Sequence, residues 1–326
     1  MGVVLGVDAG NSKTELLVAT LDGEPSALVR GPGTNAHGVG ADRCIADIAR
    51  LVERAELQPP AEHGAFFLCG VDIPSDIVEV TEAVDRTGWV RAATVDNDTF
   101  ALLRAGSDAA DVVAVVCGAG INCAGRAADG RVARYPSLGW ETGDWGGSVM
   151  LGRDVLFHAA RGEDGRGRPT ALTQIVRAHF GMSIAELGEA IHYGRIGAGR
   201  LGELAPVVVR AAEDGDAVAG ELVARLAEEV VLMVLRALAD LGVASADVVL
   251  GGGMLRDGSG SLFDQVIARL AKVAPATRPV AAVDPPVVGA ALVALDAAGA
   301  PAEAGARLRA AVRAGVAPVR VTSGAA

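Results

Sequence analysis

The sequence feature that most limits the fold is a unit that occurs twice: an apolar run, a glycine turn and a second apolar run. The first copy spans residues 3–19 with its turn at Gly10, and the second spans residues 112–125 with its turn at Gly120. Short apolar runs bounded by glycine turns are typical of buried β-strands. Two copies about 110 residues apart predict a duplicated α/β domain whose glycine hairpins face one cleft.

Helical and strand-like patterns alternate along the rest of the chain. The spacing of Ile45, Ile48 and Val52 predicts a helix over residues 40–55. At about 100–200 residues per domain, 326 residues predict two domains. We expect a small N-terminal domain over residues 1–110, completed by a C-terminal helix within about 290–315, and a larger domain over residues 111–289. Further helices are expected over residues 76–87, 98–105, 146–160, 169–180, 183–191, 201–241, 262–273, 287–295 and 301–313, and strands over 65–71, 92–95 and 248–250.

The chain is rich in apolar residues, yet they do not run together. Hydrophobic residues make up 51% of the chain, and the mean hydropathy is +0.35. A transmembrane helix needs about 18 or more consecutive apolar residues. The best candidate runs, residues 230–241 and 287–295, are interrupted by Arg236 and Asp240 or end at Asp296. We therefore expect no membrane partner.

Charge and cysteine content narrow the class of protein further. The net charge of −11 disfavours a nucleic-acid partner. An acidic protein can still bind a phosphorylated small molecule where a metal ion and backbone N–H groups supply positive potential. The chain has no C-x-x-C pair and no secretory leader pattern at Met1. We therefore expect a reduced, cytoplasmic protein.

The first glycine turn follows a carboxylate. Asp8 stands at the end of the first strand, where it can hold Mg²⁺ through water. The turn that follows can bring backbone N–H groups close to a phosphate, and its residues are Gly10, Asn11, Ser12, Lys13 and Thr14. The alternative is an ordinary hairpin with a turn that begins at an aspartate.

Two further glycine segments, residues 118–120 and 251–253, also follow apolar strands. Each alone is an ordinary turn. The order of all three, with residues 96–98 between the first two, resembles the actin-like ATPase and sugar-kinase superfamily, and within it the group of N-acetylglucosamine kinases and BadF/BadG/BcrA/BcrD-type ATPases. The match extends from Gly6 to about Leu295.

The resemblance implies an α/β fold of two ribonuclease H-like domains around a nucleotide cleft. It also implies ATP and Mg²⁺ as cofactors, with Asp8 on the metal side. Nucleotide-binding residues carried over from the family are those of the first turn together with Gly118, Ala119, Gly120, Gly251, Gly252 and Gly253. The expected partners are ATP and a small-molecule sugar, and a homodimer is the assembly left open.

Asp98 occupies the place where the sugar kinases keep their catalytic base. A carboxylate there can accept the proton of a sugar hydroxyl while that hydroxyl attacks the γ-phosphate. Asp98 also begins a predicted helix, and aspartate is a good helix cap. The two roles are compatible, and the family position favours catalysis.

Other residues match the family's sugar-binding positions. Asn35, in a Gly-Thr-Asn turn, and Asn122, after the second glycine turn, carry over as sugar ligands, and His37 is expected at the edge of the sugar pocket. Residues 139–147 resemble the family's Gly-Trp…Gly-Asp-Glu-Gly-Ser segment, from which Asp144 carries over as a carboxylate on the sugar or Mg²⁺ side. Glu141 lies in the same segment and is expected near the sugar pocket. Trp145 replaces the usual glutamate. It is expected either to stack on sugar or to anchor the loop.

The resemblance implies an ATP-dependent kinase that phosphorylates the 6-hydroxyl of an amino sugar. Its paired loop carboxylates and arginine-rich composition resemble those of actinobacterial glucosamine kinases, so D-glucosamine is the favoured substrate. N-acetylglucosamine and glucose stay open. A dehydratase-activator ATPase would need cysteines that project into a shared iron–sulfur site, and the four cysteines do not fit this. A DNA-binding regulator is disfavoured because the first strand leaves no room before it for a helix-turn-helix.

Overall fold

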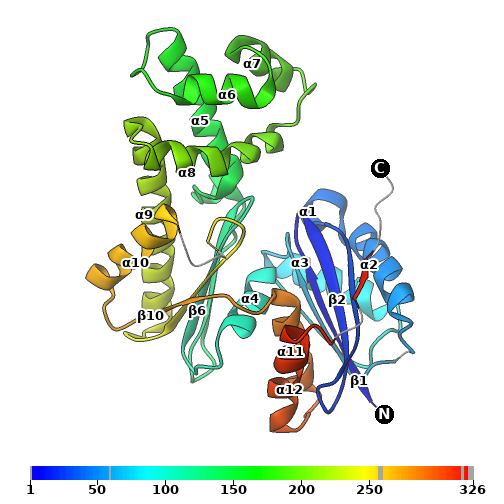
Figure 1. Ribbon diagram of the computed structural model, residues 1–326. Helices are drawn as coiled ribbons and strands as arrows, with labels where there is room; N and C mark the ends of the chain where they lie inside the picture. Colours follow the sequence, from blue (N-terminus) through cyan, green and yellow to red (C-terminus); the bar gives the residue numbers. More distant parts are fainter. Residues whose placement is uncertain (1, 59, 256–259, 317–318, 322–326) are drawn as a thin grey trace. The chain divides into compact units, whose positions relative to one another are not determined.

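The computed structural model describes residues 2–58, 60–255, 260–316 and 319–321. The chain forms two compact units, Met1–Asp108 with Ala282–Ala326, and Ala109–Ala281 (Figure 1). The return to the first unit was expected at about residue 290. It lies earlier because the whole of helix α11 (Pro286–Ala297) packs on strands and helices of the first unit.

The first unit is built on a mixed sheet in the order β11-β3-β2-β1-β4-β5. The first glycine turn joins β1 and β2, which pair antiparallel, whereas β4 and β5 continue the sheet parallel to β1. The strands are β1 (Val3–Ala9), β2 (Lys13–Thr20), β3 (Pro25–Pro32), β4 (His63–Leu68), β5 (Ala93–Asp96) and β11 (Val319–Val321).

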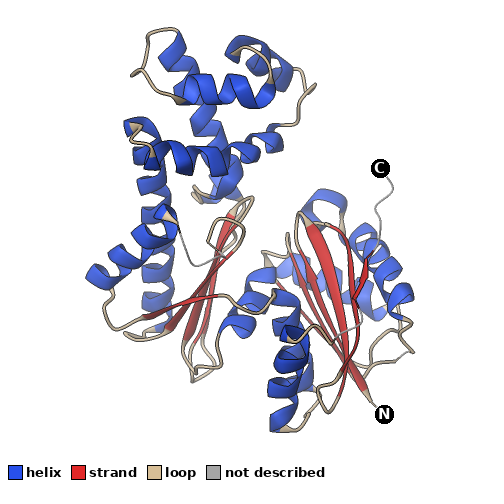
Figure 2. Ribbon diagram, in the orientation of Figure 1, coloured by secondary structure: helices blue, strands red, loops and turns tan. Residues whose placement is uncertain are grey.

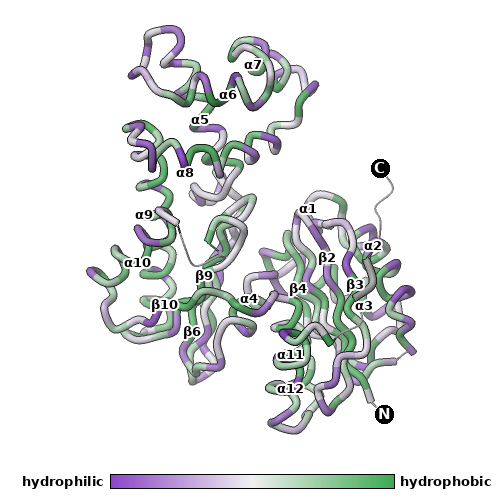
Figure 3. The backbone as a smooth tube through the Cα atoms, viewed as in Figure 1, coloured by the Kyte–Doolittle hydropathy of each residue, from purple (hydrophilic) through white to green (hydrophobic). Residues whose placement is uncertain are grey.

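Helices cover both faces of this sheet (Figure 2). Successive residues of a strand point to opposite faces. Leu5 and Val7 accordingly belong to the core with Ile48 of α2, whereas Val4 belongs to a second core with Ala291 of α11. The helices are α1 (Ala36–Val39), α2 (Ala41–Ala55), α3 (Pro74–Asp85), α4 (Asp98–Gly106), α11 and α12 (Ala302–Arg313). Most residues of α11 are apolar and buried, as its uniform hydropathy indicates (Figure 3).

The second unit repeats the strand order of the first. Its sheet runs β10-β9-β6-β7-β8, with an antiparallel β6–β7 hairpin at the second glycine turn and with β9 and β10 parallel to β6. The expected duplicated α/β fold is therefore confirmed. The strands are β6 (Val112–Cys117), β7 (Ile121–Arg126), β8 (Val132–Arg134), β9 (Asp247–Gly251) and β10 (Arg278–Ala281).

The helices of the second unit pack on this sheet and extend beyond it. The long helix α9 lies against β6, β7 and β8. The helices are α5 (Gly147–Glu163), α6 (Leu172–Phe180), α7 (Ile184–His192), α8 (Ala205–Glu213), α9 (Ala217–Leu241) and α10 (Ser261–Val273), with 3₁₀ turns at Gly139–Thr142 and Ala198–Leu204.

The continuous helical pattern expected over residues 201–241 is wrong as a single element. Gly215 has a φ of 93°, a left-handed conformation that glycine adopts without strain. Asp216 then caps α9, because its side chain accepts a hydrogen bond from the N–H of Ala219 at 2.9 Å. The sequence Asp-Gly-Asp therefore separates α8 from α9.

The chain passes between the units at two places, and one arginine of the first unit binds both. The Arg309 guanidinium on α12 donates to Asp284 Oδ2 at 2.5 Å and to Asp108 Oδ1 at 3.2 Å. It also donates to the carbonyl oxygens of Ala105 at 2.6 Å and Arg104 at 2.9 Å. Asp284 is 1% exposed. The ends of both crossings are thus fixed to α4 and α12.

None of the helices in the described part of the chain combines the length and the apolar character needed to span a membrane.

Candidate functional site

In the first unit the acidic residues collect at one edge of the sheet. Asp8 of β1 is in register with Phe67 of β4, which is in register with Asp96 of β5. Because parallel strands end at the same edge, the residues that follow β4 and β5 lie beside Asp8. Asp72 and Asp98 are two of them. We call Asp8, Asp72 and Asp98 the acidic edge.

Asp8 is a buried carboxyl at this edge. The residue is 7% exposed, and within the described part of the chain its side chain accepts no hydrogen bond. Burial, and then the negative charges of Asp98 and Glu15, raise the pKa of Asp8 well above its usual value. A cation would remove that cost by favouring the ionised form.

These features fit Mg²⁺, which is usually held by one or two carboxylates together with waters and substrate phosphates. No cluster of three or more candidate ligands is present among the residues that the structure describes. Asp8 is thus the residue that would hold the ion, with phosphate oxygens and water completing its coordination.

Asp98 is the first residue of α4. The helix is capped by Asn97, whose Oδ1 accepts a hydrogen bond from the N–H of Thr99 at 2.9 Å. Burial raises the pKa of Asp98 to about 6, although hydrogen bonds from the N–H groups of Thr99 and Asp98 itself act in the opposite direction. Asn97, and not Asp98, makes the cap, so the Asp98 carboxyl is available for proton transfer near neutral pH.

The first glycine turn is narrow and closely packed. The N–H of Gly10 donates to Lys13 O at 2.9 Å, and the N–H of Thr34 donates to Gly10 O at 3.2 Å. A Cβ atom on Gly33 would lie 2.2 Å from Asn11 O, so the segment before Asn35 fits against the turn only as glycine. Asn11 and Ser12 are exposed at the tip, and Thr14 is buried in β2.

Lys13 does not point freely from this turn. Its ammonium forms an ion pair with Glu15, which is 1% exposed, and Arg30 Nε donates to the same carboxylate at 2.9 Å. Two cations therefore neutralise one buried carboxylate. If Lys13 binds a phosphate, its ammonium must do so while it is also paired with Glu15.

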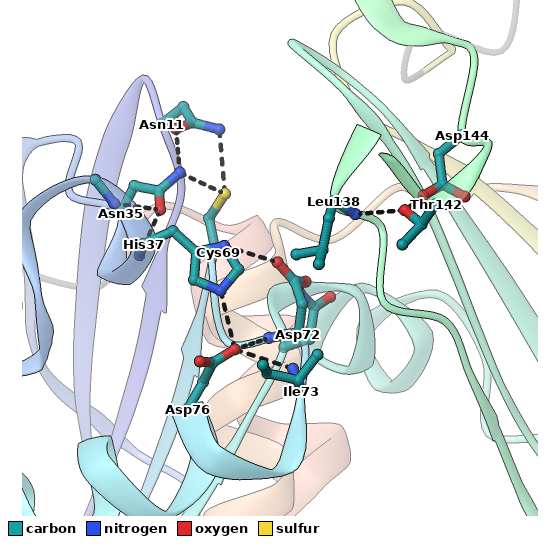
Figure 4. Close-up of polar contacts among 12 residues, drawn as sticks. Asn11, Asn35, His37, Cys69, Asp72, Ile73, Asp76, Leu138, Thr142 and Asp144 are labelled. Carbon is teal, nitrogen blue, oxygen red and sulfur yellow. Dashed lines mark hydrogen bonds and ion pairs between the residues drawn. The ribbon is translucent and has the colours of Figure 1, made fainter. Parts of the chain in front are cut away.

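Asn35 and Asn11 meet at Cys69 (Figure 4). Asn35 Oδ1 accepts from the N–H groups of His37 at 3.0 Å and Gly38 at 3.3 Å, and so caps α1. Its Nδ2 donates to Asn11 Oδ1 at 2.8 Å, and Asn11 Nδ2 donates to Cys69 Sγ at 3.1 Å. Burial and the charges of Asp98 and Asp72 raise the pKa of the Cys69 thiol. The protein thus already uses both ends of the Asn35 amide, and a sugar hydroxyl would have to replace one of these partners.

His37 faces two carboxylates. Its Nε2 lies 3.0 Å from Asp76 Oδ2, and its Nδ1 lies 3.6 Å from Asp72 Oδ2 (Figure 4). Asp72 Oδ1 in turn accepts a hydrogen bond from Asn97 Nδ2 at 2.7 Å. The sequence analysis missed Asp72. Its position directly after a buried parallel strand is the signal that could have identified it.

In the second unit the glycine turn is held by backbone alone. The N–H groups of Ser148 and Val149, in the first turn of α5, donate to Gly118 O at 2.8 Å and Ala119 O at 3.1 Å. A Cβ atom on Gly147, which has a φ of 74°, would lie 2.4 Å from the carbonyl carbon of Gly120. These N–H groups at the start of α5 are therefore used to hold the turn and are not free for an anion.

The third glycine segment lies beside the second. Gly251 ends β9, which pairs with β6, and Met254 N–H donates to Cys117 O at 3.0 Å. A Cβ atom on Gly252 would lie 2.4 Å from Cys117 O, whereas Gly253 is exposed. The predicted phosphate and adenosine segments of this unit are therefore neighbours.

A cavity of about 400 Å³ opens beside the second turn. Asp144 and the exposed residues Trp140, Glu141 and Arg153 contribute to its lining. The loop that carries Asp144 is closed by its own hydrogen bonds, from Leu138 N–H to Thr142 Oγ1 at 2.9 Å and from Thr142 Oγ1 to Asp144 Oδ2. The cavity is also lined by Ala119, Gly120, Ile121, Ser137, Leu138, Gly139, Gly146, Val149 and Met150. Arg153, the seventh residue of α5, was not recognised in the sequence.

The two tryptophans of this loop differ completely. Trp140 is 73% exposed, whereas Trp145 is 5% exposed and belongs to the hydrophobic core. The Arg225 guanidinium of α9 covers the Trp145 ring at 3.8 Å from its centroid and pairs with Asp154 of α5 at 3.2 Å. Trp145 is therefore the loop anchor, and Trp140 is the ring that a ligand in the cavity can contact.

Asn122 and two cysteines lie in β6 and β7. Asn122 is half-buried, and its Oδ1 accepts a hydrogen bond from Cys123 N–H at 2.7 Å. Cys117 and Cys123 are buried, and burial raises the pKa of the Cys117 thiol to about 12. Both stay protonated at neutral pH.

The structure thus groups the predicted residues in two sets. Asp8, the first turn, Asn35, His37 and Asp98 lie in the first unit. Gly118–Gly120, Asn122, Glu141, Asp144 and Gly251–Gly253 lie in the second.

Two curated relatives are similar to the chain over most of its length. An N-acetyl-D-glucosamine kinase of Dictyostelium discoideum is 24% identical over 314 residues, which cover 90% of this chain and 98% of the relative. An N-acetylmuramic acid/N-acetylglucosamine kinase of Clostridium acetobutylicum is 25% identical over 270 residues, which cover 79% and 87%.

Solved structures share the fold. A protein of Chromobacterium violaceum, provisionally assigned as an N-acetylglucosamine kinase, superposes with a TM-score of 0.69 at 19% identity over 90% of this chain and 99% of that chain. A ROK family glucokinase of Streptomyces griseus, solved with glucose and AMPPNP, gives 0.58 at 16% identity over 90% and 100%. The architecture is the two-domain α/β fold of actin-like ATPases and sugar kinases. The model of the BadF/BadG/BcrA/BcrD ATPase family matches residues 5–294, and the chain belongs to that family.

Proposed function

We propose that this protein is an ATP-dependent kinase that transfers a phosphoryl group to the 6-hydroxyl of an amino sugar. The observation that carries the proposal is the position of Asp98: it is the first residue of α4 at the acidic edge, and Asn97 makes the helix cap in its place. Burial raises the pKa of this carboxyl to about 6. A base with a pKa near the working pH combines a useful ionised fraction with enough basicity to accept a proton.

In the proposed reaction the sugar hydroxyl attacks the γ-phosphorus of ATP. The new O–P bond forms, the bond to the ADP oxygen breaks, and the hydroxyl proton passes to Asp98. Bound Mg²⁺ would neutralise developing charge on the phosphate oxygens, and Asp8 would hold it. The turns at Gly10 and Gly118–Gly120 would supply backbone N–H groups to the phosphates, and Gly251–Gly253 would lie along the adenosine.

We propose D-glucosamine as the preferred substrate. The cavity of the second unit presents Glu141 and Asp144, two carboxylates that can accept hydrogen bonds from an ammonium group at C2. N-acetylglucosamine is the alternative, and the names of the two curated relatives support it. An acetamide carries no charge, so its recognition would depend on the shape of the cavity and on Trp140.

A dehydratase-activator ATPase is disfavoured. Such an activator needs thiolates that reach a shared iron–sulfur cluster, whereas Cys117 and Cys123 are buried and their thiols have raised pKa values.

The test is turnover of Mg·ATP with glucosamine, N-acetylglucosamine or glucose, followed by ³¹P NMR of the product. We expect ADP and a sugar 6-phosphate in equal amounts, with glucosamine giving the highest kcat/KM. The Asp98→Asn variant is the control for contaminating kinases. ADP release that does not depend on sugar, with no sugar phosphate formed, would exclude the proposed activity.

A further inference from the structure

We infer that Asp72 is a positioning residue for the phosphoryl transfer: it fixes the Asn97 cap that presents Asp98. Asp72 touches no atom that reacts. This inference rests on the proposed function, because it assigns Asp72 a purpose only if Asp98 accepts a proton.

The contact with Asn97 sets the direction of an amide. Asn97 Nδ2 donates to Asp72 Oδ1 at 2.7 Å, and Asn97 Oδ1 accepts from Thr99 N–H at 2.9 Å. An ionised carboxylate can only accept hydrogen bonds, so it holds the NH₂ side of the amide and leaves the oxygen to the helix. The Thr99 N–H also interacts with the Asp98 carboxyl. The orientation of Asn97 therefore reaches Asp98 through one shared N–H group.

Asp72 also lies near His37, which follows the turn that carries Asn35. His37 Nδ1 lies 3.6 Å from Asp72 Oδ2, and the backbone N–H of His37 is one of the two that Asn35 Oδ1 accepts. With its oxygen facing the helix, Asn35 directs its Nδ2 to Asn11 (Figure 4). The separation from Asp72 is longer than a hydrogen bond, and Asp76 holds the other ring nitrogen at 3.0 Å, so His37 does not depend on Asp72 alone.

Burial strengthens the hydrogen bond between Asn97 and Asp72. The Asp72 side chain is 9% exposed, compared with 15% for Asp76 and 37% for His37. Hydrogen bonds to a carboxylate in a site of low dielectric constant are stronger than those at the surface. Misplacement of a reacting group by about 1 Å can reduce the rate by as much as about 10²-fold. We expect a smaller effect from a freed amide, about tenfold in kcat.

The first comparison is between Asp72→Asn and Asp76→Asn. Both changes conserve shape and remove a carboxylate next to His37, but Asp76 contacts neither Asn97 nor Asp98 and instead accepts the N–H groups of Asp72 and Ile73 at the start of α3. We expect Asp72→Asn to lower kcat about tenfold with KM for ATP unchanged. Asp76→Asn should lower the melting temperature and leave kcat within about twofold.

The second comparison exchanges the two side chains. In Asp72→Asn/Asn97→Asp, the new amide can donate to the new carboxylate, which still caps α4, because aspartate and asparagine cap equally well. Asn97→Asp alone would place two carboxylates in contact and should lower kcat at least as far as Asp72→Asn does. We expect the double variant to recover at least about threefold in kcat at pH 8, where the carboxylate introduced by Asn97→Asp and that of Asp98 are both ionised.

The outcomes separate the inference from the proposed function. If the wild-type protein releases no ADP in response to sugar, both the proposed function and the inference on Asp72 are wrong. An active wild type with unchanged kcat in Asp72→Asn removes the inference alone. The inference is also overturned if Asp72→Asn and Asp76→Asn lose kcat and melting temperature to the same extent. It is overturned as well if the double variant recovers no kcat. Either result would assign Asp72 a general structural role.

Discussion

The two glycine hairpins have the same strand pairing but different chemistry. In the first, the penultimate pair before the turn is Asp8 and Glu15, two buried carboxyls. In the second, the equivalent pair is Val116 and Asn122, which carry no charge. The first hairpin is braced by side chains such as Asn11 and Lys13, the second by the backbone of α5.

The comparison shows how a duplicated element can divide a task. A buried carboxylate favours a cation and proton transfer, whereas an uncharged glycine turn can let a ligand come close to its backbone. If the proposed function is correct, glycine turns of both units meet the phosphates, the first unit supplies the acid–base and metal chemistry, and the second supplies the carboxylates that distinguish the sugar. Each prediction below removes one side of this division.

The largest effect is expected from Asp98→Asn. Loss of a general base lowers kcat by about 10²-fold or more, while shape and most binding contacts are kept. Steady-state kinetics together with calorimetric titration of sugar and nucleotide would separate kcat from affinity. If the variant keeps nearly wild-type kcat, Asp98 is not the general base.

The pH dependence of the same residue provides a second measurement. With a pKa of about 6, the base becomes protonated in acid, so kcat/KM should fall about tenfold per pH unit below that value. The folded-state pKa lies above the usual 3.8, so the ionised carboxyl costs stability above about pH 6 and costs none below about pH 4. Asp98→Asn should therefore raise the free energy of unfolding at pH 8 by about 1–3 kcal/mol and leave it unchanged at pH 3.

Asp8→Ala tests the metal side of the first hairpin. We expect kcat/KM for Mg·ATP to fall about 10- to 100-fold, and sugar affinity to change little, because the lost carboxylate would position the ion and not the sugar. Titration of Mg²⁺ at fixed ATP should show a higher requirement in the variant. Val116→Ala is the matched change in the second hairpin, and it should leave the Mg²⁺ requirement as it is. An equal requirement in Asp8→Ala and wild type would count against this division.

Glu141→Gln tests how the second unit distinguishes the sugar. An ammonium–carboxylate hydrogen bond contributes about 1.5–3 kcal/mol, and the exposure of Glu141 places it at the lower end. The preference for glucosamine over glucose should fall about tenfold in kcat/KM, with glucose turnover retained. Asp144→Asn should instead impair both sugars, since the family motif places this carboxylate beside the reacting centre. If the ratio is unchanged in Glu141→Gln, the amine is recognised elsewhere.

The smallest effect is expected from Gly147→Ala. The new methyl group would meet the Gly120 backbone at 2.4 Å in a residue with a φ of 74°, so the turn must shift. KM for ATP should rise a few-fold, and the free energy of unfolding should fall by about 1–3 kcal/mol. Gly220→Ala in α9 is the control, because a Cβ atom there meets nothing within 4 Å and the residue lies outside the glycine turns. Similar losses in both variants would mean that the turn does not depend on close approach to α5.

The hairpins and the place of Asp98 could be predicted because their signals are local. An apolar run that ends in a glycine turn, or an Asp-Asn-Asp segment before a helical pattern, is contained within about ten residues. Short strands such as β8, β10 and β11 escaped prediction because three or four residues cannot show an alternation.

The roles of Trp145 and Asp72 could not be predicted because their partners are distant in the sequence. The ring of Trp145 is covered by Arg225, eighty positions further along the chain, and no pattern near residue 145 indicates that cation. Asp72 becomes informative only when the sheet brings Asn97 and His37 to it. Sequence spacing predicts the elements that carry the candidate residues, and tertiary packing determines which of these side chains lie together.

The guanidinium of Arg309 has a mechanical consequence. Because it holds Asp108 and Asp284 in one cluster with α4 and α12, the peptides on the first unit's side of both crossings have little freedom to rotate. Arg313 also binds Asp284, and Arg104 also binds Asp108, so each of these aspartates has two guanidinium partners. Arg309 is the side chain that joins the two pairs, so Arg309→Leu would uncouple Asp108 from Asp284 and leave each aspartate with its second guanidinium.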